Sequence, residues 1–211
     1  MTEASLRAGM VRWGASLFGR GLTPGSSGNI SVRLEEGYLV TPTNACLGFL
    51  EADRITKLDA GGRHISGDAP TKELPLHLTF HAARPSTRAV VHLHSTYATL
   101  LSCLADVDPD DAMPPITPYV VMRVGRVPVV PYTMPGSADV APLIASKAPQ
   151  HAAILLGNHG PVVAGASLEA AIFAIEELEE TARLLILSRG LPIRTLPAEA
   201  VAALKQRFPL R

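Results

Sequence analysis

Three histidines have the spacing of a metal site. His92 and His94 follow the apolar residues 89–91, which predict a buried strand. Because alternate side chains of a strand point the same way, the two imidazoles should share one face. His159 follows a second apolar run, residues 153–156, and lies in a turn. Each histidine alone is as well explained by a structural role at a strand end. Together, two imidazoles at strand spacing and one from a loop predict a divalent metal with an open coordination position, as in catalytic sites.

Glu73 is the predicted proton-transfer group and a further metal ligand. It lies at the expected start of a helix that runs to about Ala83. A carboxylate there could serve only to stabilise the helix dipole. Beside a bound cation it can instead exchange a proton, and it can ligate the metal when substrate is absent. His77 and His81 are spaced i, i+4 on the same helix and could also bind metal, but without the H-E-x-x-H order of a metalloprotease we expect them on the helix surface.

Small polar residues in three separate segments could bind a phosphate group. In the glycine and serine loop at residues 25–29, backbone N–H groups could approach an anion closely, although the loop lacks the lysine and spacing of a nucleotide-binding loop. Thr71 and Lys72 precede the first turn of the predicted helix, where free N–H groups attract anions. Each segment alone could be ordinary loop structure, but together with a metal site they predict a phosphorylated substrate. The candidate phosphate-binding residues are Gly28, Asn29, Thr43, Asn44, Thr71 and Lys72.

Composition narrows the class of protein. The chain has 211 residues, which suits a single domain over residues 1–211, and 47% of them are hydrophobic while 18% are charged, so part of the surface should be buried against other subunits. The net charge is zero, which argues against nucleic-acid and membrane-surface partners. No apolar run reaches the roughly 18 residues of a membrane span, and residues 1–10 do not resemble a secretion signal. Cys46 and Cys103 cannot form a disulfide framework, so we expect a cytoplasmic protein.

The elements that would position these residues are short strands and helices in mixed order. Hydrophobic periodicity predicts helices at residues 6–18, 95–104, 137–148 and 167–189, and a further helix that begins between residues 70 and 74 and runs to about residue 83. Strands are expected at residues 30–33, 38–41, 55–58, 63–66, 89–94, 153–156 and 161–164, with two short stretches in 120–130. Residues 106–118 should be a loop and the basic tail 205–211 solvated. Eight or nine strands with four or five helices predict an α/β layered fold around a largely antiparallel sheet.

Taken together, several of these motifs resemble the class II aldolase/adducin family. The similarity spans residues 5–190 in order, through Ser26-Ser27-Gly28-Asn29-Ile30-Ser31, Thr41-Pro42-Thr43, Glu73, Val91-His92-Leu93-His94-Ser95 and Asn158-His159-Gly160. Within the family, residues 66–73, 117–125 and 174–183 are most similar to the 3-oxo-tetronate 4-phosphate decarboxylases.

The resemblance implies a three-layer α/β/α sandwich with a central, mostly antiparallel sheet, assembled as a homotetramer. It implies a divalent metal, zinc in the first place with manganese or cobalt as alternatives, held by the three histidines near a subunit interface. It assigns acid–base chemistry to Glu73 and phosphate binding to Gly28, Asn29, Thr43, Thr71 and Lys72. Tyr119 and Arg123 are expected to reach the site of a neighbouring subunit.

The sequence departs from the family pattern at two places. Relatives often carry glycine where this chain has Asn44. Sugar-phosphate aldolases commonly place serine at the position of Lys72 and use a tyrosine from the C-terminal tail, whereas this tail ends Phe208-Pro209-Leu210-Arg211. The second departure weakens the aldolase interpretation.

The function that we expect is metal-dependent decarboxylation of a small phosphorylated acid sugar in acid-sugar catabolism. Loss of CO2 from 3-oxo-tetronate 4-phosphate would leave an enediolate, and protonation by Glu73 would give dihydroxyacetone phosphate. A fuculose-phosphate-like aldolase, a pentose-phosphate 4-epimerase or a sugar-phosphate dehydratase would use a similar site. A non-catalytic adducin-like interaction module is the alternative from another class.

Overall fold

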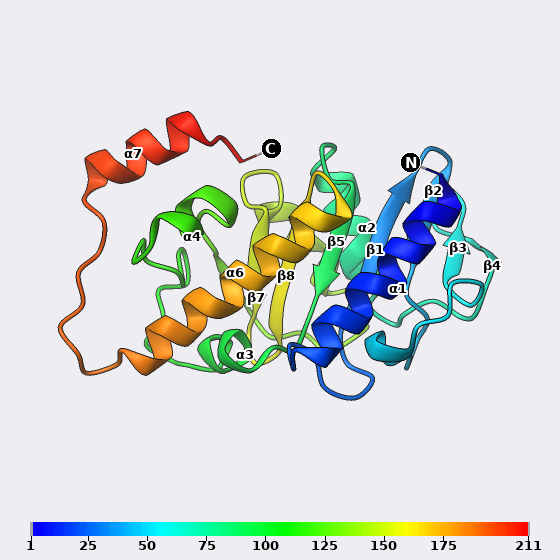
Figure 1. Ribbon diagram of the computed structural model, residues 1–211, viewed down its shortest axis with the longest axis horizontal. Helices are drawn as coiled ribbons and strands as arrows, with labels where there is room; N and C mark the ends of the chain where they lie inside the picture. The colour runs from blue at the N-terminus through cyan, green and yellow to red at the C-terminus, as the bar shows by residue number, and fades with distance from the viewer. Residues whose placement is uncertain (1, 211) are drawn as a thin grey trace.

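A single eight-stranded sheet organises the part of the chain that the computed structural model describes, residues 2–210 (Figure 1). The strand order is β4-β3-β2-β1-β5-β8-β7-β6, and neighbouring strands are antiparallel except for the parallel pair β6 and β7. The strands are β1 (Asn29–Leu34), β2 (Gly37–Val40), β3 (Thr56–Leu58), β4 (His64–Ser66), β5 (Ala89–His92), β6 (Val129–Val130), β7 (Ala153–Leu156) and β8 (Gly160–Gly165).

Helices cover both faces of this sheet. Helices α1, α3 and α6 pack on one face and on each other, while α2 and α5 pack together on the opposite face (Figure 1). The predicted three-layer α/β/α sandwich with a mostly antiparallel sheet is therefore confirmed. The helices are α1 (Glu3–Gly19), the 3-10 turn η1 (Leu47–Phe49), α2 (Leu74–Ala83), α3 (Thr96–Ser102), α4 (Pro118–Arg123), α5 (Val140–Lys147), α6 (Leu168–Leu187) and α7 (Ala198–Arg207). Among residues 2–210, none of them is long and apolar enough to span a lipid bilayer.

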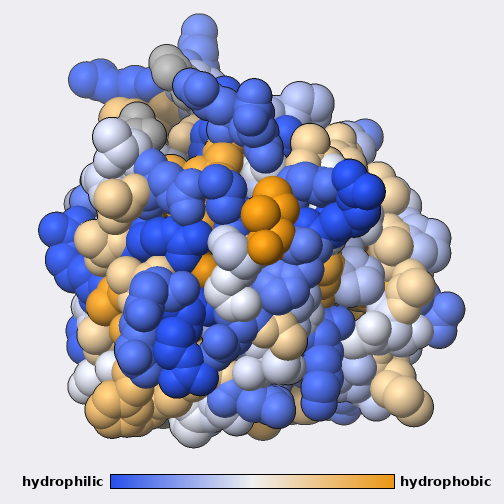
Figure 2. Space-filling model, turned by 90° about the vertical axis from the view of Figure 1, so that its right-hand side faces the viewer, coloured by the Kyte–Doolittle hydropathy of each residue, from blue (hydrophilic) through white to orange (hydrophobic). Residues whose placement is uncertain are grey.

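The central strands are buried on both faces, which explains their uninterrupted apolar sequences. In β5, Ala89 and Val91 join the core under α1 and α6, whereas Val90 joins the core under α2 and α5. The same alternation places Leu155 and Ile154 of β7 in the two cores. At the other end of the sheet, all of β4 is exposed, and the surface there is mostly hydrophilic (Figure 2). Ile65 in the middle of β4 is 55% exposed, so what limits pairing of this free edge with other chains is the shortness of the three-residue strand.

Residues near Val120 form a helix, so the prediction of two β-rich stretches in residues 120–130 is wrong in its first half. The hydroxyl of Thr117 caps α4 by accepting a hydrogen bond from the N–H of Val120, and Pro118 occupies the first turn. A side-chain cap and a proline at that position start a helix even where β-branched residues follow, because proline fixes φ at a helical value. The second half, at Val129–Val130, is the short strand β6.

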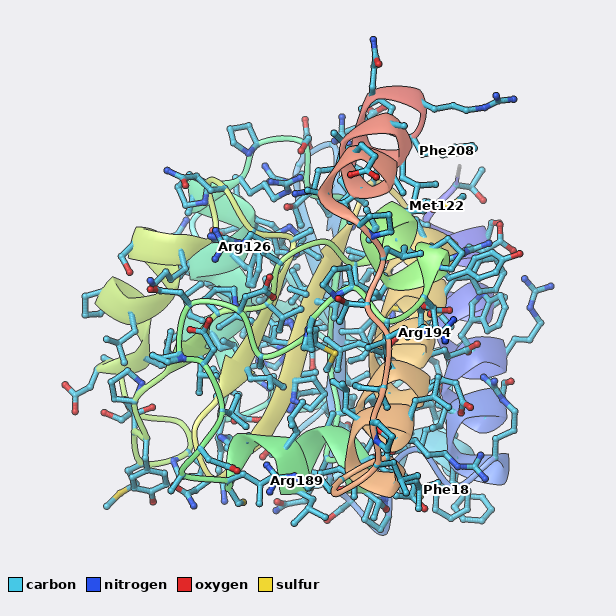
Figure 3. All side chains as sticks on the ribbon, turned by 90° about the vertical axis from the view of Figure 1, so that its left-hand side faces the viewer. Phe18, Met122, Arg126, Arg189, Arg194 and Phe208 are labelled. Carbon is cyan, nitrogen blue, oxygen red and sulfur yellow. The ribbon has the colours of Figure 1, made fainter. Side chains whose placement is uncertain are left out.

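The C-terminal helix α7 was not expected, and the predicted number of helices is too low. Seven α-helices lie within residues 2–210, and α7 has no buried residue. An extended segment that contains Arg194 joins α6 to α7 (Figure 3). Helix α7 itself contacts α4. Only a narrow part of α7 packs against the core, through the partly buried Val201 and Leu204, and so narrow an apolar stripe is a weak signal for a helix.

Replacing Glu179 with alanine should destabilise the protein. Glu179 of α6 is only 8% exposed, and its carboxylate accepts hydrogen bonds from the N–H groups of Tyr97 and Ala98 in the first turn of α3. Because the substitution leaves both donors without a partner, we expect the free energy of unfolding to fall by about 1–3 kcal/mol in urea denaturation. The matched control is Glu180→Ala, whose exposed carboxylate pairs with Arg183 at the surface and contributes little. Equal losses in the two variants would contradict this role for Glu179.

Candidate metal and active site

The imidazoles of His92, His94 and His159 meet at one point. Nε2 of His94 lies 3.1 Å from Nε2 of His92 and 3.1 Å from Nε2 of His159. The carboxylate of Glu73 completes the group, with Oε2 3.3 Å from His92 Nε2 and Oε1 3.3 Å from His159 Nε2. The four ligand atoms all lie within 4.8 Å of one another. The structure thus brings together the residues that the sequence nominated, although β5 ends at His92 and His94 lies beyond the strand.

These four residues fit a divalent cation. In a tetrahedral site with bonds of 2.0–2.1 Å, neighbouring ligand atoms are about 3.3 Å apart, close to the separations seen here. Nδ1 of the fully buried His92 donates to the carbonyl oxygen of Pro161 at 2.8 Å, so its Nε2 carries no proton when the ring is neutral. Burial lowers the pKa of His92 to about 4, even though Glu73 raises it, and burial also lowers the pKa of His94. At neutral pH both rings therefore present lone pairs.

Glu73 is held at the N-terminal end of α2 with its carboxylate facing the histidines. Its backbone N–H donates to Thr71 Oγ1, and Nδ2 of Asn29 donates to its Oε2 at 2.8 Å. Burial raises the pKa of Glu73, but the nearby His92 and the N–H of Asn29 outweigh burial, and the net direction is downward. The carboxylate is therefore ionised at neutral pH, as a metal ligand must be.

Two glycines let neighbouring loops approach the strand that carries the histidines. Gly28 has φ +80°, and a Cβ there would lie 2.8 Å from Thr23 Oγ1 and 3.1 Å from the carbonyl oxygen of His92. Gly160 has φ +152°, and its Cβ would lie 2.6 Å from the carbonyl oxygen of Leu93. A larger residue at either position would push against the segment that holds the imidazoles.

The residues predicted to bind phosphate gather beside the histidines. All six line one cavity of about 170 Å³, together with Glu73, His94 and His159. Its lining also includes Ser26 and Ser27, which belong to the predicted anion-binding loop. Pro135 completes one side, and sequence analysis missed it because no pattern marks its loop. The six are Gly28, Asn29, Thr43, Asn44, Thr71 and Lys72.

Asn44 takes the backbone conformation that glycine would favour at this position. Its φ is +57°, in the left-handed region, and it lines the cavity. Asparagine enters this region more readily than other residues with a side chain. Asn44 can therefore occupy this left-handed position next to Thr43.

His77 and His81 lie inside the protein, so their predicted position on the helix surface is wrong. Both are fully buried between α2 and the sheet, where Ser31 Oγ lies 2.8 Å from His77 Nδ1 and 2.9 Å from His81 Nε2. They are not part of the metal cluster. Spacing along a helix could not tell this inward face from a solvated one, because histidine occurs on both.

Tyr119 and Arg123 lie on another surface of the chain. They line a cavity of about 440 Å³ with Phe173 and three glutamates of α6, and that cavity shares no lining residue with the one beside the histidines. The guanidinium of Arg123 stacks 5.7 Å from the ring centroid of Phe173. Their contribution to the site of a neighbouring subunit stays a prediction.

Comparisons with known proteins agree with this geometry. The pattern of the Class II Aldolase and Adducin N-terminal domain matches residues 8–186. A 3-oxo-tetronate 4-phosphate decarboxylase of Pectobacterium atrosepticum is 51% identical, with 96% of each chain covered. An L-fuculose phosphate aldolase of Haemophilus influenzae is 34% identical, covering 89% of this chain and 86% of its own. The crystal structure of YgbL from Klebsiella pneumoniae superimposes with a TM-score of 0.94 at 51% identity, covering 97% of this chain and 99% of that one.

Proposed function

Since the chain belongs to the class II aldolase and adducin N-terminal domain family, we propose that it is a metal-dependent decarboxylase that converts 3-oxo-tetronate 4-phosphate to dihydroxyacetone phosphate and CO2. The observation that carries this proposal is the 51% identity, over 96% of both chains, to a decarboxylase of that name. The cavity is lined by the carboxylate of Glu73, by Lys72 and by two of the three convergent imidazoles, and it suits such a substrate, which is both phosphorylated and anionic.

In this proposal the residues of the cavity first bind the substrate through its phosphate. Backbone N–H groups of the loop at Gly28, the hydroxyls of Thr43 and Thr71 and the ammonium of Lys72 are the donors. Binding a group remote from the reacting carbons orients those carbons beside Glu73 and lowers the entropic part of the barrier.

The chemical step then needs an electron sink and a proton donor. A divalent cation held by His92, His94 and His159, with Glu73 as a further ligand when substrate is absent, supplies a Lewis acid that stabilises negative charge on the substrate's oxygen atoms. When the C1–C2 bond breaks, its electron pair stays on C2 and delocalises onto the C3 carbonyl oxygen as an enediolate. Glu73, having taken up a proton from solvent, donates it to C2 and completes dihydroxyacetone phosphate.

We further propose that the metal is zinc, with manganese or cobalt as substitutes, because imidazole nitrogens suit these ions. The whole chain, residues 1–211, would be one domain of a cytoplasmic homotetramer with the active site near a subunit interface. Large apolar side chains that are exposed in the single chain support an assembly. They include Tyr119 (54% exposed), Leu187 (60%) and Leu191 (64%). Tyr119 and Arg123 are our candidates for residues that complete a neighbouring site.

A sugar-phosphate aldolase is the second candidate function. The 34% identity to an L-fuculose phosphate aldolase favours it, and aldol cleavage passes through the same type of enediolate.

One assay separates the decarboxylase from the aldolase. Purified protein with zinc is incubated with 3-oxo-tetronate 4-phosphate, and released CO2 and dihydroxyacetone phosphate are measured. A parallel reaction contains L-fuculose 1-phosphate, and aldehyde is measured. We expect CO2 and dihydroxyacetone phosphate in equal amounts. Aldehyde release without CO2 would overturn the decarboxylase.

Replacing Lys72 with methionine should weaken substrate binding more than turnover. Lys72 is the only lysine or arginine among the described residues that line the cavity. Losing a charge-assisted hydrogen bond to phosphate costs about 1.5–3 kcal/mol. We therefore expect KM to rise about 10- to 100-fold with kcat little changed. Inhibition by inorganic phosphate should weaken in parallel. The matched control is Lys205→Met on the exposed face of α7, and an unchanged KM in Lys72→Met would contradict the assignment.

A further inference from the structure

Two buried histidines outside the metal cluster belong to a chain of hydrogen bonds that ends on Glu73. His81 Nε2 lies 2.9 Å from Ser31 Oγ, which lies 2.8 Å from His77 Nδ1. His77 Nε2 lies 2.5 Å from Asn29 Oδ1, and Asn29 Nδ2 donates to Glu73 Oε2 at 2.8 Å. These hydrogen bonds therefore alternate between α2 and β1 and end at Glu73, which precedes α2.

With both rings neutral and the amide nitrogen of Asn29 facing Glu73, every bond of this network has one possible direction. A carboxylate can only accept, so the amide nitrogen of Asn29 donates to Glu73 and its oxygen accepts from His77 Nε2–H. Nδ1 of the neutral His77 then carries no proton and accepts from Ser31 Oγ–H. The oxygen of Ser31 in turn accepts from His81 Nε2–H. Nδ1 of His81 is then left as an acceptor that no donor among residues 2–210 satisfies, although the nearby backbone of Thr87 raises the pKa of this ring.

The interior keeps both rings neutral, as this direction requires. Burial disfavours the charged form of His77 and lowers its pKa, although the carboxylate of Glu73 acts in the opposite direction. Burial likewise lowers the pKa of His81 to about 3, and the guanidinium of Arg33 lowers it further. Both side chains and Ser31 are fully buried, so water cannot replace a missing partner.

An asparagine side chain has two orientations of nearly equal shape, and only one of them suits a neighbouring carboxylate. With the amide reversed, its oxygen would face the oxygen of Glu73 and its NH2 group would face the N–H of His77. Both contacts would then be repulsive. His77 therefore excludes the reversed orientation of the Asn29 amide as long as its proton stays on Nε2. The hydrogen bond from the hydroxyl of Ser31 to Nδ1 keeps the proton there.

We propose that Ser31, His77 and His81 are positioning residues for proton transfer by Glu73. Through Asn29 they hold one carboxylate oxygen in place, and the other residues of the metal cluster do not supply this restraint. The inference rests on the proposed catalytic role of Glu73.

The first test removes the central hydroxyl with Ser31→Ala. Losing one buried hydrogen bond from the chain should lower kcat about three- to tenfold, with KM within about twofold of wild type and metal content unchanged. The control is Thr87→Val, because Thr87 is 1% exposed and its hydroxyl has no partner among the described residues. We expect wild-type kcat for this control. An unchanged kcat in Ser31→Ala would overturn the proposal.

The second test asks whether Ser31 acts through Glu73. In a Glu73→Gln background, Ser31→Ala should have no further effect on the residual rate, because the group that it positions is gone. A threefold or greater additional loss would show a general structural effect and would contradict the proposal.

The third test does not depend on activity, so it separates a failure of this inference from a failure of the proposed function. Nitrogen-15 NMR of wild-type protein with labelled histidine, assigned through His77→Gln and His81→Gln, reports the tautomers at pH 7. Both rings should be neutral with the proton on Nε2. A proton on Nδ1 of His77, or a charged ring, would overturn the proposed hydrogen-bond network even if the protein is an active decarboxylase. Absence of CO2 release by wild type would instead overturn the proposed function.

Discussion

Glu73→Gln should keep its metal and lose about 10²- to 10⁴-fold in kcat. Three imidazoles remain to hold the cation, and glutamine has nearly the same shape as glutamate. The amide cannot deliver a proton to carbon, and a positioned general acid contributes about this factor. The measurements are metal content by mass spectrometry and the rate of CO2 release. The matched control, Glu36→Gln in the exposed turn before β2, should match wild type in both.

A second readout follows from the reversibility of proton transfer. If Glu73 protonates C2 of the enediolate, it should also remove a proton from the corresponding hydroxymethyl carbon of dihydroxyacetone phosphate. In D2O, wild-type protein should therefore exchange one hydrogen of that group, as seen by proton NMR, and Glu73→Gln should not. A metal-replete Glu73→Gln that exchanges this hydrogen, or that turns over within tenfold of wild type, would remove Glu73 from the chemistry.

The central sheet and the clustering of the site residues could be predicted from the sequence because both depend on short-range patterns. The apolar residues of β5 and β7 predict strands, and polar residues directly after them must lie at the ends of those strands. His92, His94 and His159 meet for this reason. The fold class is confirmed, whereas metal binding by these residues stays a prediction.

The features that the sequence did not predict depend on contacts between distant segments. The side of α2 that carries His77 and His81 is buried because Ser31, 46 and 50 residues away, supplies their hydrogen bonds. Helix α4 forms because a capping hydroxyl and a proline outweigh the β propensity of its valines. Asn29 was expected to bind phosphate, yet its side chain is occupied by Glu73 and His77.

His94→Ala should lose both metal and activity. Nε2 of His94 is 3.1 Å from the Nε2 atoms of both His92 and His159. The substitution therefore removes the proposed metal ligand that lies next to both of the others. Without a Lewis acid the enediolate loses several kcal/mol of stabilisation, and CO2 release should fall at least about 10³-fold. The loss of CO2 release should persist when zinc is added to His94→Ala. The zinc concentration is the one that restores activity to wild-type protein after treatment with a chelator.

Metal-linked stability separates a lost site from a damaged fold. A ligand that binds only the folded state raises the melting temperature, so zinc should stabilise metal-free wild type but not His94→Ala. Without zinc the two proteins should melt within a few degrees of each other, because the ring of His94 is only partly buried. The control His64→Ala removes an exposed histidine on β4 and should respond to zinc as wild type does. A metal-replete, active His94→Ala would mean that these imidazoles do not hold the cation that the reaction requires.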